Sequence, residues 1–87
     1  MKILIIDDDS IVLLVQRKLL ERCDFNNSIF SFTSGEKALE YLKEENESQS
    51  FLIFLDINIP GMNGWQFLNG IKGLKGSHNM YVIMVTS

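Results

Sequence analysis

Hydrophobic residues along this chain gather in short unbroken runs with polar residues on either side. Three such runs cover residues 3–6, 51–55 and 80–85. Apolar runs of this length are typical of strands that are buried on both faces. A mixed segment at residues 28–33, which carries Ile29, Phe30 and Phe32, indicates one further strand. The pattern therefore predicts four strands that are well separated along the chain.

The segments between these strands favour helices. Residues 11–22 contain no Gly or Pro, and Asp9 or Ser10 stands where a helix N-cap belongs. A second helix is predicted to open at residues 34–37, and a third to run from about 65 to about 72. We expect the first helix to bury Val12, Val15, Leu19 and Leu20, which recur at helical spacing. We expect the other two to bury Ala38, Leu39, Leu42, Phe67, Leu68 and Ile71.

Strands and helices alternate along the whole chain. Such an order predicts an α/β fold in which helices cover both faces of a parallel sheet. The chain of 87 residues is long enough for one domain only.

Composition narrows the class of protein. Hydrophobic residues make up 46% of the chain and the net charge is −3, without the basic stripe that nucleic-acid binding requires. The run at residues 3–6 ends at Asp7 and is too short for a signal peptide or a membrane span, so we expect a cytoplasmic protein. Cys23 has no internal disulfide partner. We expect its thiol to be buried or half-buried near a helix end, and Trp65 to belong to the core.

Acidic residues follow two of the predicted strands. Asp7, Asp8 and Asp9 follow the first strand, Asp56 ends the third, and Thr86 follows the fourth. Parallel strands deliver their carboxyl ends to one edge of a sheet, so we expect these side chains to share a crevice. Carboxylates in one crevice repel each other, and Mg²⁺ relieves that repulsion. One carboxylate can then attack phosphorus and form an aspartyl-phosphate, while Thr86 donates a hydrogen bond. Asp9 or Ser10 is expected to serve as a helix cap.

These residues resemble the receiver domains of bacterial two-component signalling. The segment around Asp56 carries the most specific part of the resemblance, because an Asp followed by Pro-Gly-Met and a further Gly at this spacing is characteristic. The matching segments are Ile5-Ile6-Asp7-Asp8-Asp9, Ser34-Gly35-Glu36-Lys37-Ala38-Leu39, residues 54–64 and residues 82–87. The resemblance therefore spans essentially the whole chain and implies a flavodoxin-like sheet with strand order 2-1-3-4.

The resemblance also implies roles for individual residues. Asp56 would be the phosphoacceptor, supplied by a sensor histidine kinase or a phosphotransfer protein. Asp7, Asp8 and Asp56 would hold Mg²⁺ together with the main-chain carbonyl of Asn58. Thr86 would be the switch hydroxyl that turns toward the phosphoryl group. Such a domain is a regulatory phosphoacceptor that catalyses only its own phosphotransfer and dephosphorylation, and the sequence does not identify its downstream partner or output domain.

The family's fifth strand, which is tipped by a Lys, would lie beyond Ser87 together with its flanking helices. We therefore expect residues 1–87 to be the amino-terminal part of a receiver domain of ordinary length. If the chain truly ended at Ser87, a fourth strand at residues 80–85 would be a bare apolar edge, and such edges pair with other chains. In that case we would expect self-association of the chain through this edge.

Three other interpretations fit parts of the sequence. In a phosphohydrolase similar to the haloacid dehalogenases, Asp7 would be the nucleophile and Asp9 the acid or base, but Asp56 would have no role. A receiver-like module that binds partners without phosphorylation would be favoured if one of the acidic residues were missing, and none is. A flavin carrier of the flavodoxin type is disfavoured, because an acidic loop after the first strand would repel the cofactor's phosphate.

Overall fold

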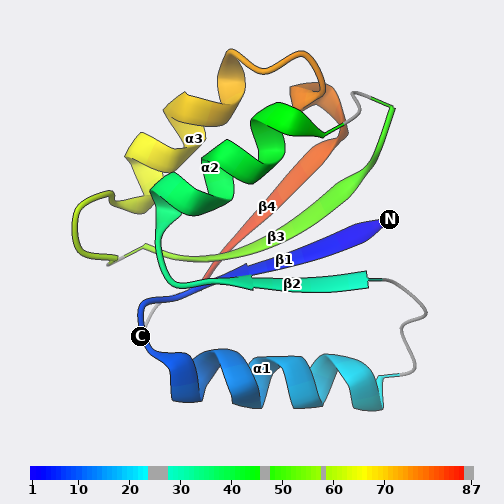
Figure 1. Ribbon diagram of the computed structural model, residues 1–87, viewed down its shortest axis with the longest axis vertical. Helices are drawn as coiled ribbons and strands as arrows, with labels where there is room; N and C mark the ends of the chain where they lie inside the picture. Colours follow the sequence, from blue (N-terminus) through cyan, green and yellow to red (C-terminus); the bar gives the residue numbers. More distant parts are fainter. Residues whose placement is uncertain (24–27, 46–47, 58, 86–87) are drawn as a thin grey trace.

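The computed structural model describes residues 1–23, 28–45, 48–57 and 59–85. Within these residues a parallel sheet lies between two layers of helix, with α1 on one face and α2 and α3 on the other (Figure 1). The strands are β1 (Lys2–Ile6), β2 (Ser28–Phe32), β3 (Phe51–Asp56) and β4 (Met80–Val85). The helices are α1 (Ser10–Arg22), α2 (Gly35–Glu44), α3 (Gly64–Lys72) and the short 3₁₀ helix η1 (Ser77–Asn79).

The strands lie in the order β2-β1-β3-β4, and every neighbouring pair is parallel. The α/β class and the strand order 2-1-3-4 are therefore confirmed. Each predicted strand is present within one residue of its expected start, and β2 ends at Phe32 rather than Thr33. None of the described helices is long and apolar enough to cross a membrane.

The main core lies between the sheet and the pair α2 and α3. It consists of alternate strand residues and the inward faces of the two helices, which are Leu4, Ile6, Phe51, Ile53 and Leu55 from the strands and Ala38, Leu39, Leu42, Phe67 and Ile71 from the helices. All five inward helix residues were predicted, and Leu68, the sixth, is half-buried against the same core. At Gly70 the two helices approach so closely that a Cβ atom would lie 2.8 Å from Leu39 Cδ1.

Of the elements that the structure describes, α1 alone covers the other face of the sheet, and the predicted inward face of this helix was wrong. Leu13 is the buried residue of this helix, whereas Val12, Val15 and Leu19 are exposed. The half-buried positions, 16, 17 and 20, fall at helical spacing from residue 13. The inward face of α1 thus contains two polar side chains. A prediction that assigns every polar residue to the solvent face therefore gives the wrong orientation for this helix.

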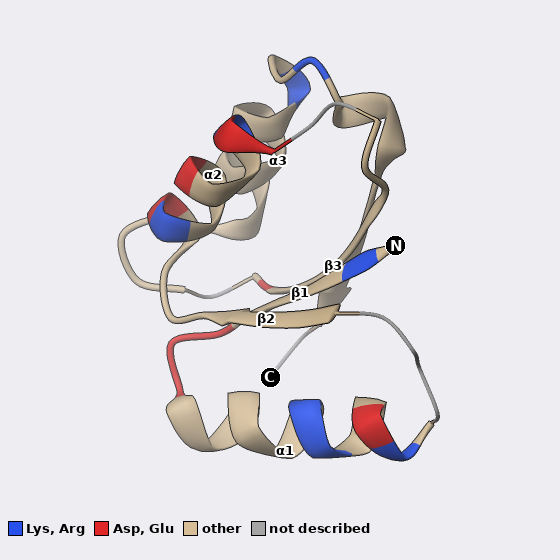
Figure 2. Ribbon diagram, turned by 45° about the vertical axis from the view of Figure 1, so that its right-hand side comes forward, with Lys and Arg blue, Asp and Glu red and all other residues tan. Residues whose placement is uncertain are grey.

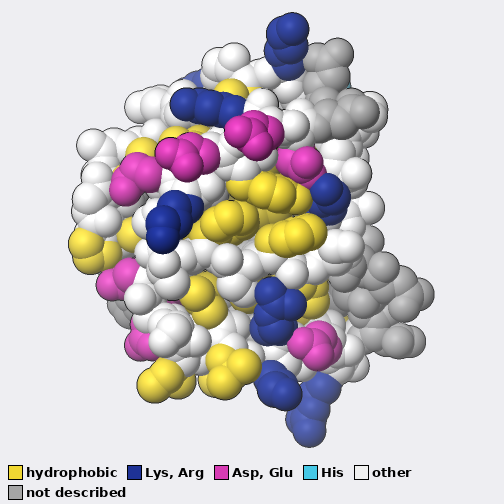
Figure 3. Space-filling view, viewed as in Figure 1, with side chains coloured by type: hydrophobic (Ala, Val, Ile, Leu, Met, Phe, Trp, Pro, Cys, Tyr) yellow, Lys and Arg dark blue, Asp and Glu magenta, His cyan; other side chains and the backbone are white. Residues whose placement is uncertain are grey.

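The physical reason is visible at Arg17. Its guanidinium group reaches the edge strand β2, where Nη2 donates to the carbonyl oxygen of Ile29 at 3.0 Å and to Ser31 Oγ at 3.1 Å. The carbonyl groups along an edge strand can pair with a strand of another chain, and Arg17 binds one of these groups. In the space-filling view, hydrophobic and basic side chains both reach the surface over α1 (Figure 3).

Two further predictions of burial were wrong. Cys23 is the C-cap of α1 and is exposed, since its position follows the last helical turn. Trp65 is 66% exposed, because it follows Gly64 in the first turn of α3 on the face opposite Phe67.

Candidate functional site

The register of the sheet brings two carboxylates together. Side chains alternate between the faces of a strand, so the α1 face carries Ile5 of β1 beside Phe54 of β3. Two residues further along each strand, the same face carries Asp7 and Asp56. The aspartates therefore continue a row that is apolar everywhere else.

Asp8 completes an acidic cluster at this edge of the sheet. One carboxylate oxygen from each of Asp7, Asp8 and Asp56 lies within 4.8 Å of the other two. Asp7 is 7% exposed and Asp56 6%, whereas Asp8 is exposed. In Figure 2 the acidic loop between β1 and α1 and the acidic end of β3 lie at the same edge. The structure thus brings together the three aspartates that were predicted to meet.

The cluster opens into a cavity of about 330 Å³, which we call the acidic crevice. Its walls are formed by Asp7, Asp8, Asp9, Val12, Gln16, Asp56 and Val85. Val85 is the partner of Asp56 across the β3–β4 pair, so β4 forms one side of the opening. The crevice is therefore bounded by three strands or strand ends and by the first two turns of α1.

Asp9 belongs to the wall of the crevice but has a structural role. Its Oδ1 accepts a hydrogen bond of 2.9 Å from the backbone N–H of Ile11 and caps α1. Its own backbone N–H donates to Asp7 Oδ1 at 2.9 Å. Of the two cap residues that the sequence allowed, Asp9 is the one used, and its turn holds the Asp7 carboxylate in place.

Burial and like charge both act on Asp7. Burial raises the pKa of the Asp7 carboxyl above its ordinary value, and the negative charges of Asp56 and Asp8 raise this pKa further. The hydrogen bond from the backbone of Asp9 opposes this change by stabilising the carboxylate. The cluster is therefore strained electrostatically as long as only protein atoms are present.

This donor set fits a divalent cation with a preference for oxygen. Mg²⁺ binds through one or two carboxylates, keeps several waters and completes its shell with phosphate oxygens. The three aspartates offer carboxylate oxygens at close range, and the crevice leaves room for water and for a small anion. A cation here would remove the repulsion that raises the pKa of Asp7.

A glycine turn and a helix cap shape the loop after Asp56. Gly61 has φ = 87°, a left-handed conformation that favours glycine. Asn63 then caps α3 in a capping box with Gln66, in which each side chain accepts from the other's backbone N–H at 2.9 Å. Two predicted site residues, Asn58 in this loop and Thr86 after β4, lie outside the described residues, as does Ser87.

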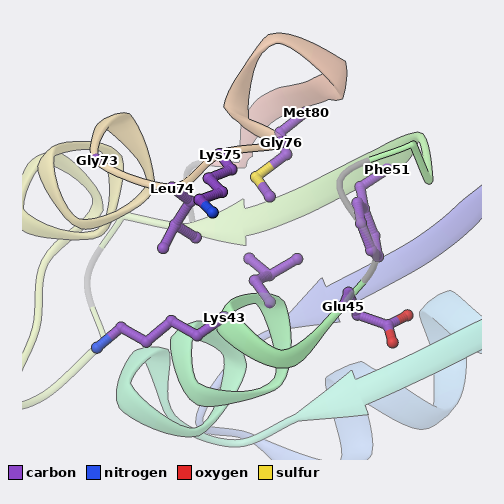
Figure 4. Close-up of a pocket in the computed structure, with 9 residues that line it drawn as sticks. Lys43, Glu45, Phe51, Gly73, Leu74, Lys75, Gly76 and Met80 are labelled. Atoms are coloured by element: carbon purple, nitrogen blue, oxygen red, sulfur yellow. The ribbon is translucent and has the colours of Figure 1, made fainter.

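A second hollow of about 440 Å³ lies at the opposite end of the sheet (Figure 4). The side chains of Phe51, Leu74 and Met80 converge on it, while Lys43 extends away. Among its described lining residues the acid is Glu45, which is paired with Lys2. Although it is larger than the acidic crevice, this hollow contains none of the predicted functional residues.

Sequence reasoning missed one residue of the crevice wall. Gln16 was assigned to the solvent face of α1, yet it is half-buried and lines the crevice. The signal that could have found it is its spacing of three residues from Leu13, the residue that did not fit the predicted stripe.

Comparison with known proteins places the chain in a family. Residues 3–87 match the family model described as the response regulator receiver domain. The two-component response regulator ARR10 of Arabidopsis thaliana is 32% identical over 87 residues, which are 100% of this chain and 15% of ARR10. The chain thus spans about one seventh of this relative's length.

Solved structures agree with this match. A response regulator receiver protein from Dyadobacter fermentans is 26% identical with a TM-score of 0.89, over 100% of this chain and 69% of that one. The MaeR response regulator bound to beryllium trifluoride is 28% identical with a TM-score of 0.81, over 100% of this chain and 68% of that one. With its 2-1-3-4 parallel sheet and its three aspartates at the carboxyl edge, the chain belongs to the response regulator receiver domain family.

Proposed function

We propose that this chain is a phosphoacceptor, in which Asp56 takes up a phosphoryl group with the help of Mg²⁺ and so switches a partner or output domain. The observation that carries the proposal is the convergence of Asp7, Asp8 and Asp56 within 4.8 Å, two of them buried. Structural roles for separate aspartates would give no reason for all three to face one crevice.

The chemistry follows from the positions of these side chains. Asp56 ends β3 on the floor of the crevice, so a carboxylate oxygen can attack phosphorus that enters from the open side. With a phosphohistidine as donor, the new O–P bond forms on Asp56, the N–P bond breaks, and the histidine leaves as imidazole after taking a proton from solvent. When bound, Mg²⁺ would neutralise charge on the transferring group and be held by the carboxylates of Asp7, Asp8 and Asp56.

Two predicted residues complete the proposed site. The main-chain carbonyl of Asn58 would be a further ligand of Mg²⁺, and Thr86 would donate its hydroxyl to the phosphoryl group. The donor would be a sensor histidine kinase or a phosphotransfer protein, and the exchange would take place in the cytoplasm. Beryllium trifluoride, which is bound to the related MaeR, is an expected ligand of this crevice as a mimic of the phosphoryl group.

The test is to incubate the chain with Mg²⁺ and a small phosphoramidate donor and to measure the gain of a phosphoryl group by mass spectrometry. We expect one base-labile group on the wild-type chain and none on Asp56→Asn. Asp9→Asn is the matched control, because asparagine also caps helices and this variant should be labelled normally. Label that persists in Asp56→Asn and maps to Asp7 would instead support the phosphohydrolase interpretation.

A further inference from the structure

The acidic crevice has a polar wall residue for which the aspartate chemistry gives no role. The amide oxygen of Gln16, Oε1, is buried and has no hydrogen-bond donor among the described residues. Buried acceptors in folded proteins nearly always have a partner, and an exception calls for an explanation. In the described part of the chain, Gln16 Oε1 is the one buried side-chain atom in this condition.

Gln16 separates two hollows on the α1 face of the sheet. On one side lies the acidic crevice. On the other lies an apolar hollow of about 200 Å³, whose remaining walls are Ile5, Leu19, Leu20 and Phe54. Gln16 lines both, so its side chain forms the partition between them.

None of the described side chains that line the two hollows can donate to the amide oxygen. The apolar hollow is lined by hydrocarbon, and the acidic crevice by carboxylates and two valines. Ionised carboxylates accept hydrogen bonds but do not donate them, and a phosphoryl group likewise presents acceptor oxygens. The proposed function assigns the hydroxyl of Thr86 to the phosphoryl group. Water is the donor that remains, and a water on a cation is polarised to donate strongly.

We propose that Gln16 is a positioning residue for the cation of the acidic crevice, and that its amide oxygen accepts a hydrogen bond from a water carried by that cation. The terminal torsion of a Gln side chain is soft, so the amide can turn into the crevice without moving α1. Partners of this outer-shell kind orient what the direct ligands hold. The inference rests on the proposed function, because it requires that the crevice bind Mg²⁺.

The test compares Gln16→Leu with the wild-type chain in two measurements. The first is the Mg²⁺ dissociation constant by calorimetric titration, which we expect to rise by about tenfold or more, the usual range for loss of an outer-shell partner. The second is unfolding by denaturant in EDTA, where we expect no loss of stability, because leucine removes an unpaired buried acceptor. Gln49→Leu is the control, since Gln49 precedes β3 at the opposite end of the sheet.

The outcomes separate the two proposals. Wild-type chain that binds no Mg²⁺ overturns the proposed function and this inference with it. Wild-type affinity in Gln16→Leu overturns this inference alone. If Gln16→Leu loses stability in EDTA, Gln16→Met, with an unbranched side chain of similar length, replaces it. Loss of Mg²⁺ affinity in a variant of wild-type stability supports the positioning role, and an equal loss in Gln49→Leu refutes it.

Discussion

Removing one charge from the acidic crevice should stabilise the metal-free chain. Asp7→Asn is the variant of choice, because asparagine retains the oxygen that accepts the hydrogen bond from the backbone N–H of Asp9. The variant should therefore keep the local geometry and lose only the charge. We expect it to be more stable than wild type in EDTA at neutral pH and to gain little or nothing from Mg²⁺.

The magnitude follows from the distances in the cluster. Two unit charges 4.8 Å apart repel each other by about 0.9 kcal/mol in water and by about 3.5 kcal/mol at an effective dielectric constant of about 20. Asp56 is buried, but Asp8 is exposed and the crevice is open to solvent, which favours the lower end. The hydrogen bond to a neutral amide is also weaker than that to a carboxylate. A gain of about 1 kcal/mol is expected, which in a domain of this size raises the melting temperature by about 4–8 °C.

The pH dependence of stability gives an independent check on the direction of the Asp7→Asn effect. The pKa of Asp7 is raised in the folded chain, so this group's contribution to stability is present at low pH and is lost as pH rises through the folded pKa. Metal-free wild type should therefore gain stability relative to Asp7→Asn as the pH falls through the raised pKa of Asp7 toward the ordinary range of a carboxyl group. Glu45, whose pKa is lowered by its hydrogen bond with Lys2, is present in both proteins, so its titration cancels from this comparison.

The assay is denaturant unfolding in EDTA over a series of pH values from 7 down into the range in which carboxyl groups titrate, followed by circular dichroism. Glu40→Gln, which removes an exposed carboxylate from α2, is the control for general charge effects. If Asp7→Asn is less stable than wild type at pH 7, or if the stability difference between the two proteins stays the same over the whole series, the electrostatic account of the crevice is wrong.

Three further changes test other parts of the structure. Leu13→Ala should cost about 2–5 kcal/mol in denaturant unfolding, whereas Leu14→Ala should stay within about 0.5 kcal/mol; similar losses would contradict the orientation of α1. In a protein made of residues 1–87 alone, Ile83→Lys should abolish concentration-dependent self-association through β4, as measured by light scattering, and a wild-type fragment that is monomeric at all concentrations would refute that expectation. Tyr41→Phe should lower the free energy of unfolding by about 0.5–1 kcal/mol, because the Tyr41 hydroxyl hydrogen-bonds Lys2 and Glu45 across the end of the sheet. An unchanged midpoint of denaturant unfolding would show that these hydrogen bonds do not contribute to stability.

The sheet and the acidic cluster could be predicted because each depends on strong local signals. Unbroken apolar runs define buried strands, and an aspartate at the end of such a run has to lie at the carboxyl edge of a parallel sheet. That Asp7 and Asp56 share this edge follows from strand direction, whereas the neighbouring positions of β1 and β3 were implied only by the family resemblance. Their separation, and the contribution of Asp8, required the register of β1 against β3.

The orientation of α1 could not be read from hydropathy in the same way. Its apolar residues outnumber the positions that one face can bury, so the pattern leaves the inward direction undetermined. Two features of the tertiary structure decide it: Arg17 binds the edge of β2, and Leu13 is the buried residue of α1. Trp65 and Cys23 were misplaced for a related reason, since hydrophobic character does not identify a first helical turn or a C-cap that lies in solvent.

The inward position of polar residues on α1 connects the fold to the site. A helix with Gln16 and Arg17 inward and Val15 and Leu19 outward gives up part of the burial energy that its sequence could provide. Local rules are broken in folded proteins mainly where function or specificity requires it. Arg17 binds the edge of β2, and Gln16 supplies the wall of the crevice with a neutral side-chain acceptor among carboxylates.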